Sequence, residues 1–294
     1  MAERIRLAVL GGSGFYDMPG ISNIEEYAIA TPYGATSDAI RVGTLEGERV
    51  AFLARHGRRH TILPSELPQR ANFWALKSLG VHAVLAVSEV GSLRADYRPG
   101  DLVCPDQLID RLRGSRPETF FGEGIVAHVG FAEPFCESLR ATAIAASAAA
   151  GSPAKDGGAY VVIEGPAFGT KAESHLYRQW EASIVGMTAL PEARLAREAE
   201  LCYALIAAVT DYDAWHESEE TVTATSVFAV LQRNVEVSQR VVHELVRTVA
   251  TRAECNCATS LDRAMVTGSS AIPAEKKESL APILGRWLAE RGTR

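Results

Sequence analysis

The sequence predicts an α/β fold, with one β-sheet that carries helices on both of its faces. Five short apolar runs, at residues 5–10, 50–54, 84–87, 160–163 and 205–209, alternate with segments of helical pattern. Runs this short and this apolar are typical of central strands that are covered on both faces. Because the chain shows no internal repeat, low-complexity stretch or linker-like segment, we expect a single domain over residues 1–294.

Helices are predicted between and after these runs. Ser65 is placed to cap a helix that ends near Gly80, and another helix is expected over residues 134–151. A longer helix begins near Thr225, and the segment from Ala274 onward is predicted to be the last one. The long helix has positions that recur at three- and four-residue spacing and form an apolar stripe: Val227, Val230, Leu231, Asn234, Val237, Val241, Leu245 and Val249.

Composition and charge favour a globular protein that acts on a small molecule. Hydrophobic residues make up 47% and charged residues 22% of the chain, which excludes a disordered protein. The net charge is -6 and no basic run reaches five residues, so neither nucleic acid nor a membrane surface is the expected partner. No signal-peptide core and no stretch of about 18 apolar residues is found, so we expect a cytoplasmic protein.

The cysteines do not form a recognisable framework. Five of them are scattered along the chain, at Cys104, Cys136, Cys202, Cys255 and Cys257. An odd number in a chain expected to be cytosolic is not the pattern of a disulfide scaffold. The Cys255 and Cys257 pair has no second CxxC and no histidine near it in the sequence, so we expect no zinc site. Plain thiols are the favoured interpretation, and a local redox or disulfide device is the alternative.

Two clusters that follow predicted strands are suited to an anion. Gly11-Gly12-Ser13-Gly14 follows the first run, where backbone amides and the Ser13 hydroxyl could cradle an anion, although such a turn is as often only a turn. The run from Arg55 to His60 follows the second, and the planar fork of Arg55 matches phosphate oxygens. A solvated basic loop is the alternative. His56 and His60 lack a third ligand, so a metal site there is not expected.

Paired carboxylates follow the last apolar run. Asp211 and Asp213 are two residues apart, so we expect them to project from one strand end on the same side. Two carboxylates that face a pocket raise the pKa of one of them, and the protonated one can then donate a hydrogen bond. Such a donor suits N7 of a purine leaving group, and a carboxylate acceptor suits its 6-amino group. Two solvated aspartates in a loop are the alternative.

An aromatic residue lies in the loop before a further helix. Phe168 is placed to cover an aromatic ring of a ligand, although an aromatic residue in a loop as often only packs.

Taken together, these segments resemble a known family. GGSGFYD, TPYGATSDAIRVG, ARHGRRHTILPSE, AEPFC, EGPAFGTKAES, GMTALPEARLAREAELCYA and TDYDAW follow one another as they do in the 5'-methylthioadenosine phosphorylases, of the trimeric branch of the purine nucleoside phosphorylases. The resemblance covers nearly the whole chain and includes the C-terminal CxC. It implies a purine nucleoside phosphorylase-like fold, a mixed central β-sheet flanked by helices. It also implies a pentosyltransferase that forms adenine and 5-methylthioribose 1-phosphate, with phosphate as co-substrate and with no metal or organic cofactor.

The resemblance also assigns residues. The phosphate site that it implies consists of Ser13, Arg55, His56, Ser88, the backbone at residue 89, and Thr188. Asp211 and Asp213 would read N7 and N6 of adenine, with Asp211 favoured for N7, and Met187 would lie under the ribose. His128 resembles a residue that a neighbouring subunit lends to the pocket of the 5' group, which implies a homotrimer. The same pocket would involve Gly169, Ala224, Val227 and Phe228.

Several of these positions depart from the family pattern. Glu89 replaces an alanine in a segment whose backbone contacts phosphate. If its carboxylate faced the pocket, it would repel a phosphate dianion by roughly 1 to 4 kcal/mol, or would hold a water and turn the enzyme into a hydrolase. Alternatively, Glu89 turns away and pairs with Arg55 or another basic side chain. Gly169, Ala224 and Phe228 differ in the region of the 5' group, so a different 5'-modified adenosine is a further hypothesis, and a catalytically silent purine-binding protein is a third.

Overall fold

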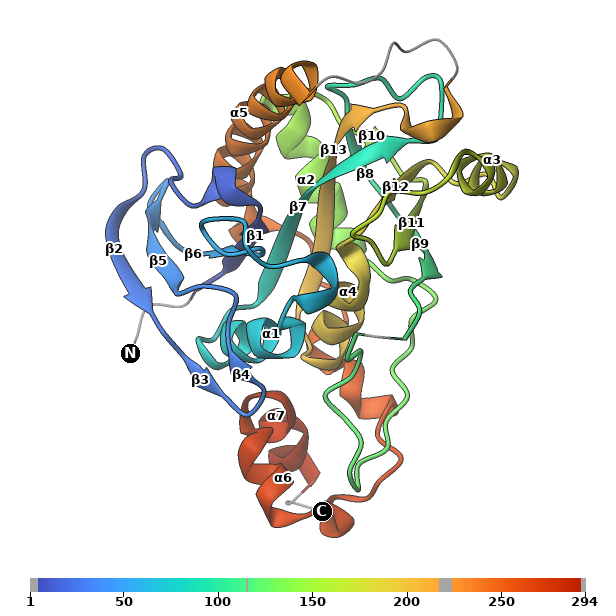
Figure 1. Ribbon diagram of the computed structural model, residues 1–294. Coiled ribbons are helices and arrows are strands. Elements are labelled where there is room, and N and C mark those ends of the chain that lie inside the picture. The colour runs from blue at the N-terminus through green and yellow to red at the C-terminus, as the bar shows by residue number, and fades with distance from the viewer. Residues whose placement is uncertain (1–4, 115, 217–223, 292–294) are drawn as a thin grey trace.

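The computed structural model describes residues 5–114, 116–216 and 224–291, and it describes the side chains in these ranges except for Ser13 and residues 224–229. Within them, one eleven-stranded sheet forms the middle of the molecule (Figure 1). Its strands are β1 (Leu7–Gly11), β2 (Ser22–Tyr27), β5 (Ile40–Leu45), β6 (Glu48–Ala54), β7 (Ala83–Ser92), β8 (Leu102–Cys104), β9 (Gln107–Arg111), β10 (Lys155–Asp156), β11 (Ala159–Ile163), β12 (Ile184–Gly186) and β13 (Cys202–Asp211). The short strands β3 (Ala30–Thr31) and β4 (Gly34–Ala35) pair with each other.

The sheet is mixed, as predicted. Its main path runs in the order β10-β8-β13-β7-β1-β6-β5-β2. The four central strands β13, β7, β1 and β6 are parallel to one another, whereas β5 is antiparallel to β6 and β8 is antiparallel to β13. The carboxyl ends of the four parallel strands therefore lie at the same edge of the sheet.

Helices cover both faces of the sheet. They are α1 (Gln69–Ser78), α2 (Glu137–Ala149), α3 (Lys171–Gln179), α4 (Ala189–Glu198), α5 (Ala224–Thr248), α6 (Ala274–Ser279) and α7 (Ala281–Arg291). α2 and α5 pack against each other and against β13 on one face, whereas α1 and α4 pack together on the other face, with α7 against α1. None of the helices in the described ranges combines the length and the apolar character that a membrane span requires.

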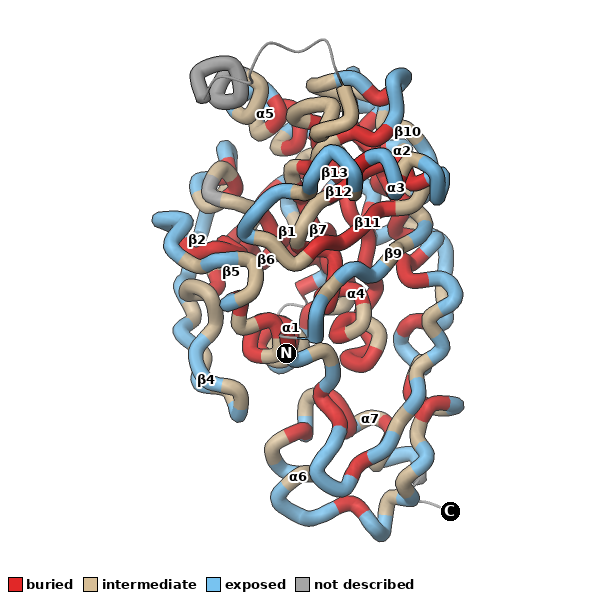
Figure 2. The backbone as a smooth tube through the Cα atoms, turned by 45° about the vertical axis from the view of Figure 1, so that its right-hand side comes forward, coloured by how far each residue is buried: buried red, intermediate tan, exposed pale blue. Residues whose placement is uncertain are grey.

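Strand side chains alternate between two hydrophobic cores. In β13, Ile206 belongs to the core under α2 and α5, whereas its neighbour Leu205 belongs to the core under α1 and α4. Both are fully buried, and burial of a side chain of this size contributes about 1.5–3 kcal/mol. Figure 2 shows the same contrast along the backbone, because the central strands are buried while β2, at the edge of the sheet, is largely exposed.

The structure confirms all five predicted strands and corrects two helix predictions. Ser65 lies in a short 3-10 turn (Pro64–Glu66) and does not cap α1, which begins at Gln69 after Pro68. The carbonyl of Pro68 already accepts the amide of Asn72 at 2.9 Å, so the helix begins there. The predicted last helix is two helices, α6 and α7, because Pro282 has no N–H with which to continue the hydrogen bonding of α6.

Candidate active site

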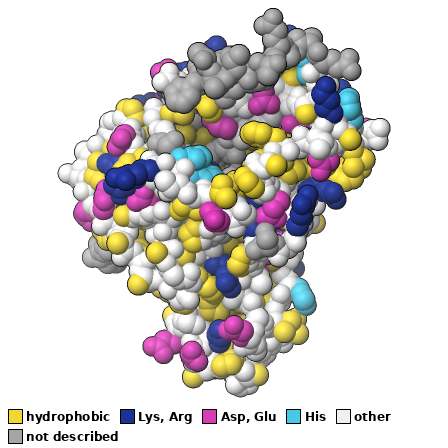
Figure 3. All heavy atoms as spheres, viewed as in Figure 1, with side chains coloured by type: hydrophobic (Ala, Val, Ile, Leu, Met, Phe, Trp, Pro, Cys, Tyr) yellow, Lys and Arg dark blue, Asp and Glu magenta, His cyan; other side chains and the backbone are white. Residues whose placement is uncertain are grey.

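The polar clusters predicted to form one site meet at the carboxyl edge of the parallel strands. The amide of Arg55, after β6, donates to the carbonyl of Gly11 at the end of β1 over 2.9 Å. Across the sheet, Asp211 at the end of β13 lies opposite Gly91 of β7. On the side of the molecule shown in Figure 3, histidine and acidic side chains gather around a hollow in its upper half. Ligands of open α/β sheets bind at such an edge.

Arg55 is held in a buried ion pair. Its guanidinium is 2% exposed, and its Nε and Nη2 donate to the two carboxylate oxygens of Glu192, which is fully buried in α4. Nη1 donates to the carbonyl of Val87 at 3.0 Å, and Nη2 also donates to the carbonyl of Leu10 at 3.1 Å. These bonds use four of the five N–H groups of an arginine. The fork of Arg55 therefore faces Glu192, and one N–H of Nη1 is left for an anion.

Sequence reasoning missed Glu192, which is the centre of this network. Besides Arg55, its carboxylate accepts the hydroxyl of Tyr203 at 2.8 Å and the amide of Gln69 at 3.3 Å. The sequence contained one signal for its burial. In the segment ALPEARL, Glu192 stands among residues that α4 buries, so an acidic side chain there needs a partner inside the protein. The network joins α4, α1 and β13 to the loop after β6.

Two hydroxyl groups of the predicted phosphate site come together. The Oγ of Ser88, in β7, lies 3.0 Å from Oγ1 of Thr188, the residue that precedes α4. Both side chains are buried, and both hydroxyls are able to donate to an anion. Ser13 lies in the short turn after β1, at the same edge, but its side chain is outside the described part of the chain.

His56 is a neutral imidazole whose proton position is fixed. Its Nδ1 lies 2.7 Å from the carbonyl of Ile62, an acceptor, so Nδ1 carries the proton and Nε2 is the free nitrogen. The ring is stacked on His60, with a centroid distance of 4.5 Å. Burial lowers the pKa of His56 to about 4, and the nearby charge of Arg55 acts in the same direction. A phosphate beside it would favour a proton on Nε2, which would turn the ring into a donor.

The two aspartates lie together, as predicted, but in different surroundings. Asp211 accepts the hydroxyl of Thr210 at 2.6 Å and the amide of Asp213 at 2.8 Å. Burial raises the pKa of Asp213, and the charge of Asp211 adds to the rise. Asp213 also adopts a positive φ of 47°, a conformation that is uncommon for a residue other than glycine.

Among the described residues, no basic side chain pairs with Glu89. One carboxylate oxygen accepts the side-chain amide of Asn234 over 3.0 Å, and that amide also donates to the carbonyl of Val209 at 3.2 Å. Neighbouring residues of a strand point to opposite faces, so Ser88 reaches Thr188 while Glu89 faces α5. The expected partner Arg55 is occupied by Glu192. Asn234, counted in the sequence as part of an apolar stripe, is instead a buried polar partner.

The loop before α3 contains one strongly constrained glycine. Gly165 has a φ of 68°, and a Cβ there would lie 2.5 Å from Sδ of Met187. Phe168, in the same loop, is 86% exposed in the single chain, so its ring is not packed in the core. Gly169 lies beside Glu173, whose carboxylate accepts the amide and hydroxyl of Thr170 at the start of α3.

Arg116 holds the backbone around Met187 in place and was not predicted. Its Nη1 donates to the carbonyls of Met187 at 2.7 Å and Leu190 at 3.1 Å, and its Nε donates to Glu164 at 2.9 Å. The side chain is buried. It therefore fixes the segment between β12 and α4 against the loop that follows β11.

The remaining predicted residues are not brought to this cluster by described contacts. His128 is exposed on a segment that pairs with the region of Met265, where its amide donates to the carbonyl of Ala264 at 2.8 Å. Ala224, Val227 and Phe228 lie in the first turns of α5, but their side chains are outside the described part of the chain.

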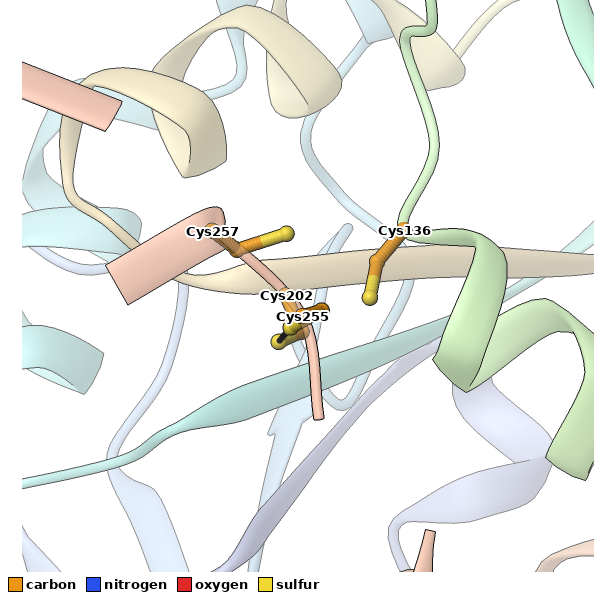
Figure 4. A group of neighbouring side chains, drawn as sticks. All are labelled: Cys136, Cys202, Cys255 and Cys257. Carbon is orange, nitrogen blue, oxygen red and sulfur yellow. Dashed lines mark hydrogen bonds between the residues drawn. The ribbon is translucent and has the colours of Figure 1, made fainter. Parts of the chain in front are cut away.

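The argument against a zinc site considered only the CxC pair, but the structure brings two further cysteines to it. Cys136 and Cys202, far from the CxC pair in sequence, lie beside Cys255 and Cys257. The four sulfur atoms all lie within 4.8 Å of one another (Figure 4). Spacing along the chain could not reveal this, because the fold supplies the second pair. Cys104 is a separate buried thiol.

Comparison with known proteins identifies the family. The family described as the Phosphorylase superfamily matches residues 6–247. The chain therefore belongs to the phosphorylase superfamily.

Within that superfamily, several similar proteins are methylthioadenosine phosphorylases. The chain is 52% identical over 281 residues to the S-methyl-5'-thioadenosine phosphorylase of Chloroflexus aurantiacus, with 96% of this chain and 98% of that protein covered. It is 46% identical to the protein of that name from Geobacter sulfurreducens, over 96% of this chain and 99% of the other. A methylthioadenosine phosphorylase from an antarctic soil metagenomic library has a crystal structure that matches with a TM-score of 0.92 and 45% identity, over 96% and 99% of the two chains. The Schistosoma mansoni enzyme in complex with adenine matches with a TM-score of 0.80 and 33% identity, over 96% and 98%.

The Arg55–Glu192 pair leads to a stability prediction. Glu192→Gln keeps the shape of the side chain but leaves the buried charge of Arg55 unpaired, which costs about 3–5 kcal/mol. We expect a correspondingly large drop in the thermal unfolding midpoint at equal protein concentration. The control is Asp96→Asn, which breaks the exposed pair with Arg94 and costs less than about 1 kcal/mol. Equal midpoints for the two variants would contradict this role of Glu192.

Glu89 leads to a prediction about pH. Burial raises the pKa of Glu89 to about 7, although the bond from Asn234 acts to lower it. The unfolded chain loses this proton near pH 4.3, so the folded state is progressively disfavoured as pH rises from there to about 7. Glu89→Gln removes this penalty, so the variant should be more stable than the parent at pH 8 by up to about 3 kcal/mol.

The advantage should shrink at pH 5, where most of the penalty has not yet developed. Urea unfolding of both proteins at pH 5 and pH 8 checks this, with Glu278→Gln, at an exposed position of α6, as the matched control. An advantage of the same size at both pH values would show that titration of Glu89 is not its source.

Proposed function

We propose that the protein catalyses the phosphorolysis of 5'-methylthioadenosine to adenine and 5-methylthioribose 1-phosphate. The observation that carries this proposal is the arrangement of two polar pairs at one edge of the sheet. The hydroxyl pair consists of Ser88, on β7, and Thr188, which precedes α4. The carboxyl pair consists of Asp211, at the end of the adjacent strand β13, and Asp213, in the 3-10 helix that follows. The first pair suits an anionic nucleophile, and the second suits a purine leaving group. The protein is a pentosyltransferase of the purine nucleoside phosphorylase type, and the names of its relatives support this substrate.

On the phosphate side, the groups that bind the anion act chiefly as donors. Ser88 and Thr188 donate hydroxyl hydrogens, Arg55 offers its remaining N–H, and His56 donates through Nε2 once protonated. Ser13 and the amide of residue 89 complete the proposed site. A dianion held here lies against the ribosyl cation that develops in the transition state, and such fixed electrostatic stabilisation supplies on the order of 3 kcal/mol.

On the base side, we propose the reverse of the assignment made from the sequence. Because burial raises the pKa of Asp213, we assign the donation of a proton to N7 of adenine to this carboxyl group. Asp211, which accepts from Thr210 and from the amide of Asp213, also accepts from the 6-amino group. Protonation at N7 neutralises the charge that the purine gains as the glycosidic bond breaks.

The 5' side of the substrate requires a second subunit in this proposal. His128 is exposed on its own chain, which suits a residue that reaches the site of a neighbour in a homotrimer. Met187, fixed by Arg116, would lie under the ribose, with Phe168 over the base. Gly169 and the first turns of α5, with Ala224, Val227 and Phe228, would surround the methylthio group. A cytoplasmic role in purine salvage accords with release of free adenine.

Hydrolysis is less well supported than phosphorolysis. A hydrolase would need Glu89 to activate water, but the carboxylate is directed at Asn234 and shares its buried amide. Its raised pKa also leaves it largely protonated below pH 7, and a protonated carboxyl group repels phosphate little.

The first experiment is adenine release from 5'-methylthioadenosine, measured with and without phosphate. Release should require phosphate, and the second product should be a sugar 1-phosphate. Equal release without phosphate would establish hydrolysis instead. No release in either case, with turnover of another 5'-modified adenosine, would move the substrate assignment to that compound.

The two aspartates should respond differently to amidation. Asp213→Asn should lower kcat by about 10²–10⁴ with a small change in KM, because proton donation to N7 acts in the transition state. Asp211→Asn should shift preference toward a 6-oxopurine nucleoside, because an amide N–H donates to a carbonyl that a carboxylate would repel. The exposed Asp96→Asn is the control. A large fall in kcat for Asp211→Asn alone would restore the assignment made from the sequence.

A further inference from the structure

We propose that Cys136, Cys202, Cys255 and Cys257 form a structural site for one divalent metal ion of the zinc type. The inference rests on geometry and does not depend on the proposed reaction. These four residues make up a four-thiol cluster, in which the side chains point toward one another from separate parts of the fold (Figure 4).

The spacing of the sulfur atoms fits a single tetrahedral ion. All four Sγ atoms lie within 4.8 Å of one another, and those of Cys202 and Cys255 are 3.3 Å apart. A zinc ion with Zn–S bonds of about 2.3 Å places its sulfur ligands about 3.8 Å apart. Small rotations of the side chains therefore suffice. A site for several iron atoms would need its thiolates farther apart, because each would bind a different metal atom.

The ligands come from three segments that are otherwise held in place. Cys136 precedes the first turn of α2, where its amide donates to the carbonyl of Tyr203 at 2.8 Å. Cys202 is the first residue of β13. Cys255 lies in the segment after α5, and Cys257 is the first residue of the 3-10 helix Cys257–Arg263. Three of the four side chains are buried and Cys255 is partly buried, so the four-thiol cluster forms a closed site. Structural zinc sites are closed in this way and take four protein ligands.

The charge around the four-thiol cluster suits thiolates. Four thiolates and a divalent ion carry a net charge of -2. Arg252 lies against them, with Nη2 at 3.2 Å from the sulfur of Cys202 and Nη1 at 3.6 Å from that of Cys255. The amino end of α2, directly after Cys136, adds partial positive charge. Thiolate ligands select zinc and other soft or borderline metals over magnesium and calcium.

The position of the four-thiol cluster indicates a structural role. Cys202 begins β13 and Asp211 ends it, so the four thiols and the base-reading carboxylates are separated by the length of that strand, about 30 Å at 3.3 Å per residue. A metal ion there would tie the segment after α5 to α2 and to the start of β13. Its loss should lower stability and leave the chemistry of the folded enzyme largely unchanged.

The test is the metal content of the full-length protein, purified with a phosphine reductant and measured by mass spectrometry of the elements. We expect close to one zinc per chain in the parent and in Cys104→Ala, the matched control outside the four-thiol cluster, and less than a tenth of that in the double variant Cys255→Ser/Cys257→Ser. Chelation of the parent should lower its thermal midpoint by several degrees, and added Zn²⁺ should restore it.

A titration of the metal-free parent with Co²⁺ keeps the proposal testable if the double variant does not fold. Binding should saturate at one equivalent, with the intense thiolate-to-cobalt absorption of a tetrahedral site. Zinc well below one equivalent together with no cobalt absorption in the reduced parent would overturn the proposal. So would peptide mapping that finds these cysteines joined as disulfides in the isolated protein. Each result is independent of whether the enzyme is phosphate-dependent.

Discussion

The buried ion pair between Arg55 and Glu192 is the constraint on which the rest of the site depends. It lies near the carboxyl edge of the sheet, where Arg55 also donates to the carbonyl groups of Leu10 in β1 and Val87 in β7. Burying two charges is costly, and the cost is offset because the hydrogen bonds to Tyr203, Gln69 and the two carbonyls satisfy them. The pair thereby fixes the strand ends relative to α4, and with them the distance between Ser88 and Thr188.

A second consequence of this arrangement is electrostatic. The charge of Arg55 is balanced by Glu192 before any ligand arrives. The proposed anion site therefore depends on hydroxyl and amide dipoles as much as on net positive charge. On the base side, two carboxyl groups share a small space, and burial together with the charge of Asp211 raises the pKa of Asp213. The two halves of the proposed site are therefore formed by groups of the chain that are already held in place by its own hydrogen bonds.

The sequence was sufficient for the features that depend on local pattern. Five apolar runs predicted five strands, and their polar ends predicted where Arg55, Ser88 and Asp211 would meet. The features it missed depend on pairing across the fold. Asn234 has the spacing of an apolar stripe, and only the packing of α5 on the sheet shows that it serves Glu89.

Glu192 and the cysteines illustrate the same limit. Glu192 looks like any helical glutamate until its burial is known. Cys202 and Cys255 are 53 residues apart, so no spacing rule joins them. The predicted start of α1 was wrong for a local reason. Pro68 occupies the position before the first helical residue, and Ser65 belongs to a separate 3-10 turn.

The alternation of Ser88 and Glu89 on β7 has a consequence for how such enzymes diverge. The hydroxyl of residue 88 faces Thr188, whereas the side chain of residue 89 faces α5 and contributes to the proposed anion site through its backbone amide. An amide group is the same in every residue except proline, so the side chain at position 89 is free of the chemistry. It can drift from alanine to glutamate provided that α5 supplies a compensating partner, and here Asn234 is that partner. Positions 89 and 234 should therefore change together among descendants of one ancestor, while position 88 stays fixed.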